Sequence, residues 1–286
     1  MFLRKLGEKN YLMKNPGAYI TLPIATLLTY IHTLRKGRLI VGNNGEKIPS
    51  RRDVQEHHLK TFVSALQISD TFFPVGMYNF SHSLESFVQM EIVKDVDDLS
   101  LLLNDILIHQ IAPADCVALA NAYRAAEQSD LNNLLHIDEM LYSMKLSGEI
   151  RECSVKTGRC LLSNLLLMVA ERPIFNDFHE IVRTGISPGN YAVVLGLGGY
   201  LLRMSCPETM MTELYSFCVS FVGAAMRLIK MDHFTAIKTI NKLQPLFIEI
   251  IQKNINKEYD EMYSCAPLVD IMSIKHERAN VRMFLS

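Results

Sequence analysis

The chain has 286 residues, of which 49% are hydrophobic and 21% charged, so its composition excludes a disordered protein. A formal net charge of −1 argues against a general nucleic-acid-binding protein. Six cysteines are spread along the chain without a Cys-x-x-Cys pair. This spacing argues against a disulfide framework or a structural zinc site and favours a cytoplasmic location.

The first 58 residues differ from the rest in charge. Residues 1–60 carry 11 Lys or Arg and 4 Asp or Glu, whereas the remaining 226 residues carry 18 and 26. The apolar stretch 19–34 is shorter than the about 20 residues that span a bilayer, and Pro23 and His32 interrupt it. We therefore expect a basic N-terminal extension, residues 1–58, that contains no membrane span or signal peptide and ends in a linker at 35–58.

Three interpretations of this extension remain open. It is a flexible arm, a segment that binds a membrane surface, or an over-extended gene model in which Met13 or a later codon is the real start.

From Leu59 onward, apolar residues recur with the period of an α-helix, and no pair of alternating strands is apparent. The pattern predicts helices at 95–111, 114–128, 130–145, 149–170, 187–204, 205–230 and 232–255. We expect residues 59–286 to form an all-α single domain of roughly eight to ten helices.

Helix ends carry recognisable signals. Asp95 can cap the first of these helices, and Pro113 is expected to break it. Ser187 is the expected cap of the helix at 187–204. Ser205 with Glu208 forms the pattern of a capping box.

Glycines within helical patterns predict close contacts between helices, since each lowers helix propensity by about 1 kcal/mol relative to Ala. They are Gly158, Gly196, Gly198, Gly199 and Gly223. The run 196–201 is not a dinucleotide fingerprint, because its sixth residue is Leu201 and no strand precedes it. The chain contains no P-loop motif, so any nucleotide chemistry must come from a partner.

Candidate catalytic groups are few. His82 and Glu85 are spaced to share a helix face, but zinc normally takes three or four protein ligands, so a hydrogen-bonded pair is the favoured interpretation. Adding His276 gives the alternative hypothesis of a helical metal-dependent hydrolase. No Gly-x-Ser-x-Gly elbow is present, and any metal ligands remain unknown.

Two stretches have an unusual composition. In residues 66–88, Pro74 and Gly76 predict a turn that groups Phe73, Tyr78 and Phe80, either as a buried aromatic turn or as a contact surface. The last twelve residues, KHERANVRMFLS, combine charged and apolar side chains where a terminus would ordinarily fray.

Five blocks, in order, resemble the urease accessory protein F (UreF) family over residues 59–286. The first comprises Leu66, Gln67, Asp70, Pro74, Val75, Gly76, Tyr78, Ser81, Leu84 and Glu85. The second comprises Glu149, Ile150, Arg151, Ser154 and Gly158, and the third is the run 191–196. The fourth combines 225–228 with 243–245, and the last comprises Pro267, Asp270, His276, Glu277, Arg282, Phe284 and Ser286.

This resemblance implies an all-α homodimer without catalytic activity. Such a chaperone recruits and gates the GTPase accessory protein UreG on the complex of the scaffold accessory protein UreD (or UreH) with apo-urease, so that nickel enters the urease active site. It implies a nickel-binding role within the complex, with no cofactor permanently bound and nickel able to pass through. The implied partner-binding residues are Tyr78, Glu85, His276, Glu277, Arg282, Phe284 and Ser286.

Three positions depart from the family pattern. Phe80 stands where the family often has His or Trp, Ser83 where it often has Gly, and Asn190 where it often has His. If the histidines at the positions of Phe80 and Asn190 handle metal in relatives, this chain lacks the side chains for that role.

Overall fold

A computed structural model describes residues 11–15, 18–22, 40–41, 47–48, 51–70, 76–169, 172–279 and 281–284. The chain divides into two compact units, Met1–Thr61 and Phe62–Ser286.

The first unit contains two short antiparallel pairs of strands. Strand β1 (Tyr11–Asn15) pairs with β2 (Ala18–Leu22), and β3 (Ile40–Val41) pairs with β4 (Lys47–Ile48). Helix α2 (Arg51–Ser69) begins here, so the linker prediction is wrong for residues 51–58. No Gly or Pro follows Pro49 in this stretch, and an exposed Glu56–Lys60 ion pair one turn apart supports the helix. The domain boundary between residues 58 and 59 stays a prediction.

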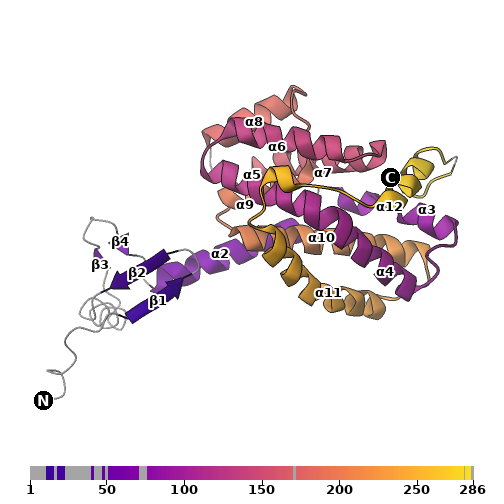
Figure 1. The fold of residues 1–286 in the computed structure, drawn as a ribbon, viewed down its shortest axis with the longest axis horizontal. Coiled ribbons are helices and arrows are strands. Elements are labelled where there is room, and N and C mark those ends of the chain that lie inside the picture. Colours follow the sequence, from indigo (N-terminus) through magenta and orange to yellow (C-terminus); the bar gives the residue numbers. More distant parts are fainter. Residues whose placement is uncertain are drawn as a thin grey trace, which may run out of the picture. The chain divides into compact units, whose positions relative to one another are not determined.

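The described residues of the second unit are helical and contain no strand, which confirms the predicted all-α domain (Figure 1). Its α-helices after α2 are α3 (Leu84–Gln89), α4 (Val96–Ile106), α5 (Val117–Glu127), α6 (Leu131–Met144), α7 (Gly148–Leu165), α8 (Pro173–Arg183), α9 (Tyr191–Leu201), α10 (Cys206–Leu228), α11 (His233–Asn254) and α12 (Pro267–Glu277). A π-helical segment, η2 (Leu107–Cys116), joins α4 to α5, and the short 3₁₀ turns are η1 (Met77–Asn79) and η3 (Tyr259–Glu261).

Helix α9 lies at the centre of the core. Every side of it is apolar, residues 191–199 are all buried, and it packs against α5, α7 and α10 (Figure 1). A helix that is hydrophobic all round can be accommodated only where neighbours surround it. This position explains why residues 191–196, a family block, contain no charged side chain.

Two glycines confirm the predicted close helix contacts. A Cβ atom at Gly158 would collide with the carbonyl oxygen of Gly189, and one at Gly196 would collide with the carbonyl oxygen of Leu119. The first contact brings α7 against the start of α9, and the second brings α9 against α5. Both glycines are therefore needed for backbone approach.

The prediction that Pro113 breaks its helix is wrong. Residues 96–127 run as one continuous helix whose middle, η2, widens to π geometry around the proline. Pro113 has no N–H for the carbonyl of His109, which instead accepts a hydrogen bond from Cys265 N at 2.9 Å. The carbonyl of Pro113 accepts from Tyr263 N at 3.2 Å. The loop before α12 thus satisfies the groups that the wide turn frees.

The continuous helix 96–127 is long and apolar enough to cross a membrane by length and composition. In the structure, 72% of its apolar window is buried inside the fold, as in the core helix of a folded domain.

The predicted cap at Ser187 is also wrong, since α9 begins at Tyr191 and Asn190 precedes it. Ser187 donates instead to the buried carboxylate of Asp138 at 2.6 Å. The same carboxylate accepts from the backbone N–H of Gly189 and from both nitrogens of Asn190. Asn190 is therefore a buried structural residue. The predicted caps at Asp95 and Ser205 are confirmed, the latter as a complete capping box.

The Gly158 contact makes a direct prediction. Gly158→Ala should reduce the free energy of unfolding by about 1–3 kcal/mol, because the added methyl group must push α7 away from α9. Ser163→Ala, on the exposed face of the same helix, should change it by less than about 0.5 kcal/mol. Urea unfolding followed by circular dichroism measures both, and equal effects would contradict the close-packing interpretation.

Candidate functional site

Four parts of the chain meet where α3, α7, α12 and the C-terminal tail come together. We call this cluster the C-terminal anchor and define it as Glu85, Glu149, His276, Glu277, Arg282 and Phe284. Glu85 lies on α3, Glu149 on α7, and His276 and Glu277 on α12. The C-terminal tail provides Arg282 and Phe284.

A buried histidine lies between two carboxylates at the centre of the anchor. His276 is fully buried, and its Nε2 lies 3.0 Å from Glu85 Oε2 while its Nδ1 lies 2.7 Å from Glu149 Oε1. Carboxylates accept but do not donate, so both ring nitrogens carry protons and the side chain is an imidazolium. Burial alone would lower the pKa of His276, but the hydrogen bonds from its ring to Glu149 and Glu85 outweigh burial and raise it.

The Glu85 carboxylate also holds the tail by its backbone. Met283 N donates to both carboxylate oxygens at 2.8 and 3.1 Å, and Phe284 N donates to Oε2 at 3.1 Å. Glu85 is only 4% exposed, and burial by itself raises the pKa of its carboxyl. The hydrogen bonds from Met283, His276 and Phe284 reverse that effect and keep the pKa below its usual value.

The second carboxylate, Glu149, lies at the start of α7. Arg282, whose side chain is 40% exposed, reaches it at 3.2 Å. Glu277 Oε1 accepts a hydrogen bond from Glu149 N at 2.8 Å, which satisfies one of the free N–H groups of the first turn of α7. A carboxylate in this position also interacts favourably with the positive end of the helix dipole. Glu277 thereby fixes α12 against α7.

Phe284 provides the apolar contact of the tail. Its side chain is 4% exposed, and the guanidinium of Arg227 on α10 lies 4.1 Å from the centre of its ring. That distance is within the range of a cation–π interaction. The tail is therefore fastened by backbone hydrogen bonds, charge pairs and one buried aromatic ring.

Five of the seven predicted site residues belong to the anchor: Glu85, His276, Glu277, Arg282 and Phe284. For Tyr78 only the backbone, in η1, is described, and Ser286 lies outside the described residues. That the seven residues contact a partner stays a prediction. Sequence reasoning did not name Glu149 or Arg227 as site residues, although both lie in family-like blocks, which was the available signal.

The proposed trio of metal ligands does not assemble. Glu85 and His276 bond to each other, whereas His82 lies 3.3 Å from Ser220 Oγ and packs on Phe217. Burial, with a smaller effect of Lys145, lowers the pKa of His82 to about 4. Across the part of the chain that is described, no group of three or more His, Cys, Asp or Glu side chains is arranged to hold a metal ion. The geometry gives no support to the hydrolase alternative.

Comparison with known proteins places these residues in context. The model of the UreF family matches residues 93–244. Urease accessory protein UreF 2 of Brucella suis is 31% identical over 225 residues, which cover 77% of this chain and 90% of the relative. Urease accessory protein UreF of Yersinia enterocolitica is 28% identical over 229 residues, covering 78% and 96%. UreF of Trichodesmium erythraeum is 25% identical over 226 residues, covering 78% and 95%.

The hydrogen bonds of Glu85 predict the effect of a neutral isostere. In Glu85→Gln, one oxygen becomes an NH₂ group that faces donors, so at least one buried N–H loses its acceptor. We expect the free energy of the local opening that exposes the amides of Met283 and Phe284 to solvent to fall by about 1–3 kcal/mol. Hydrogen exchange followed by mass spectrometry or NMR measures this. The exposed Glu139→Gln change is the control, and unaltered tail protection in Glu85→Gln would refute the role of Glu85.

The raised pKa of His276 predicts a pH dependence. The charged side chain of His276 contributes fully to the free energy of unfolding below pH 6.5, its ordinary pKa. This contribution is lost as pH rises through the higher pKa that His276 has in the folded state. NMR titration should therefore give a pKa above 6.5 for His276. The stability difference between the native chain and His276→Gln should shrink as pH rises from 6 to 9. A measured pKa at or below 6.5 would contradict the charged pairing.

Proposed function

Because the chain belongs to the UreF family of urease accessory proteins, we propose that it is a non-catalytic chaperone of urease maturation. It recruits the GTPase accessory protein UreG to the complex of the scaffold accessory protein, UreD or UreH, with apo-urease. By holding the GTPase in one geometry, it couples GTP hydrolysis to nickel release into the urease active site. The nucleotide chemistry belongs to the GTPase, in agreement with the lack of a P-loop motif in this chain.

The C-terminal anchor is the observation that supports this proposal most strongly. Glu85 and His276 are 191 residues apart in sequence, yet together with Glu149 they hold a tail from which Val281 and Met283 face outward. Val281 is 82% exposed and Met283 64% exposed, although their neighbour Phe284 is buried. An ordered terminus that presents apolar side chains is suited to binding a partner, because little conformational entropy remains to be lost.

Further exposed apolar side chains lie on the helices that the anchor joins to the tail. Leu268 and Ile271 are exposed on α12, and Lys275, one turn after Ile271, lies against Met90 at the end of α3. We call Met90, Leu268, Ile271, Val281 and Met283 together the tail patch. Methionine and aliphatic groups accompanied by Arg282 match the composition of interface centres, which favours a protein partner with an apolar contact face.

The remaining elements of the proposal follow from the family. The chain acts in the cytoplasm as a homodimer, and it binds the GTPase and the scaffold protein, through which it reaches apo-urease. It engages no nucleic acid and spans no membrane. Nickel is the cargo of the complex, and this chain holds no permanent cofactor.

The tail patch is tested by changing one exposed side chain. Met283→Asp should weaken binding to the scaffold protein about tenfold or more, because a carboxylate would be desolvated at the contact. The fold should persist, since Met283 contributes its backbone N–H to the anchor. Leu167→Asp, two residues after the end of α7 and 89% exposed, is the matched control. Co-purification with the scaffold protein and UreG, followed by a urease activation assay, gives the readout.

Truncation after Asp270 removes four of the six anchor residues, including His276 and Phe284, and should abolish both the complex and urease activation. If Met283→Asp and the truncated chain both assemble and activate urease normally, the tail is not a partner-binding element.

A further inference from the structure

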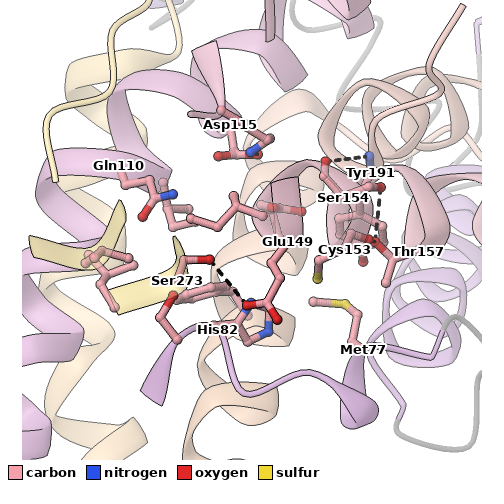
Figure 2. Close-up of a pocket in the computed structure, with 18 residues that line it drawn as sticks. Met77, His82, Gln110, Asp115, Glu149, Cys153, Ser154, Thr157, Tyr191 and Ser273 are labelled. Atoms are coloured by element: carbon pink, nitrogen blue, oxygen red, sulfur yellow. Dashed lines mark hydrogen bonds and ion pairs between the residues drawn. The ribbon is translucent and has the colours of Figure 1, made fainter. Parts of the chain in front are cut away.

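A small cavity lies in the interior of the second unit, between η2, α7, α9, α10 and α12 (Figure 2). Its volume is about 70 Å³, and the turn before α3 completes its wall through Met77, His82 and Ser83. Unlike the surrounding core, it is lined by many polar side chains. Figure 2 shows Gln110, Asp115, Glu149, Tyr191 and Ser273 around it.

Three buried polar atoms on this wall have no hydrogen-bond partner within the described residues. They are Ser83 Oγ, Asp115 Oδ2 and Glu213 Oε2. Each residue is 5% exposed or less. The hydroxyl of Tyr191, also on the wall, pairs with that of Ser216. Folded proteins leave few buried polar atoms unpaired, so three around one small space indicate a common partner within it. Burying such atoms against an empty space would be strongly unfavourable.

The charges around the cavity balance. Lys145 and Asp115 form a buried ion pair at 2.7 Å. Burial, reinforced by Asp115 and opposed by Lys145, raises the pKa of Glu213 to about 8, so this carboxyl keeps its proton at neutral pH. His82 is uncharged there, and Glu149 is balanced by His276 and Arg282 of the C-terminal anchor. A wall without net charge favours a neutral occupant over an ion.

Size restricts the occupant further. Pockets for drug-sized ligands measure roughly 300–1,000 Å³, far more than this cavity, whereas each water molecule occupies about 30 Å³ in the liquid. The volume therefore suits about two water molecules. Water can both donate and accept hydrogen bonds. The wall requires both, because the protonated carboxyl of Glu213 needs an acceptor and the carboxylate of Asp115 needs a donor. The ionised Asp115 accepts from water, and the protonated Glu213 donates to it.

The backbone at the cavity wall is strained. His82 and Ser83 both have left-handed conformations, with φ of 51° and 70°. Such conformations are unfavourable for non-glycine residues and persist where the surroundings hold them.

We propose that this cavity is an internal hydration site, in which about two ordered water molecules bridge the carboxyl groups of Asp115 and Glu213 to the hydroxyl of Ser83. The waters are part of the folded structure. Ser273 of α12 and Glu149 of α7 belong to the same wall, so the hydration site lies directly behind the C-terminal anchor. The inference is independent of the proposed function, because it depends only on the interior of this chain.

A crystal structure of the full chain at high resolution tests the proposal directly. We expect electron density for water in the cavity, within hydrogen-bond distance of Asp115 Oδ2 and Glu213 Oε2. A cavity without density, or one closed by direct bonds between these oxygens and other protein groups, would overturn the proposal.

A second measurement in solution uses variants. Magnetic relaxation dispersion of water ¹⁷O counts the long-lived internal water molecules of the native chain. Ser83→Gly removes one hydroxyl from the cavity, at a left-handed position that glycine adopts readily, and should lower that count by about one. Tyr263→Phe, which alters a half-exposed ring, should leave the count unchanged. Equal counts in the native chain and Ser83→Gly would contradict a bridging water at Ser83.

Discussion

The imidazolium of His276 between Glu85 and Glu149 is the interaction on which the C-terminal half of the structure depends. It joins α3, α7 and α12 at one buried point, and the two carboxylates then bind the tail through the amides of 283–284 and through Arg282. Loss of one partner would leave an uncompensated charge in the interior, which is strongly destabilising. A terminus that would otherwise fray is thereby held in one place, with Phe284 buried and the side chains of Val281 and Met283 outward.

The position of α12 in turn depends on an irregular helix far away in the sequence. Pro113 forces η2 to widen, and the carbonyls of His109 and Pro113 then bind the loop at 263–265 that leads into α12. The same π-helical segment presents Asp115 to the interior cavity. Pro113 therefore influences both the loop that leads into α12 and the position of Asp115 on the wall of the interior cavity. Irregular turns of this kind often occur at functional sites.

Much of the helical architecture could be predicted because its signals are local. Helical periodicity, the cap at Asp95 and the capping box at Ser205 act within a few residues, and each is confirmed. Gly158 and Gly196 also sit at the predicted close contacts, although the partner helices could not be read from their spacing. Predictions failed where a distant group changed a local preference. Ser187 does not cap α9 because the carboxylate of Asp138 binds it, and Pro113 does not end its helix because the loop at 263–265 satisfies the freed carbonyls.

The sequence by itself determined the family, the all-α class and five of the residues that form the C-terminal anchor, because these depend on residue identity in ordered blocks. It could not determine what those residues touch. Only the tertiary structure decided that His276 pairs with Glu85 and Glu149 while His82 stays apart. It likewise decided that the unpaired polar groups of Ser83, Asp115 and Glu213 share one cavity. The physical reason is that charge pairing and burial depend on distances between helices. The spacing of residues along one helix gives no information about those distances.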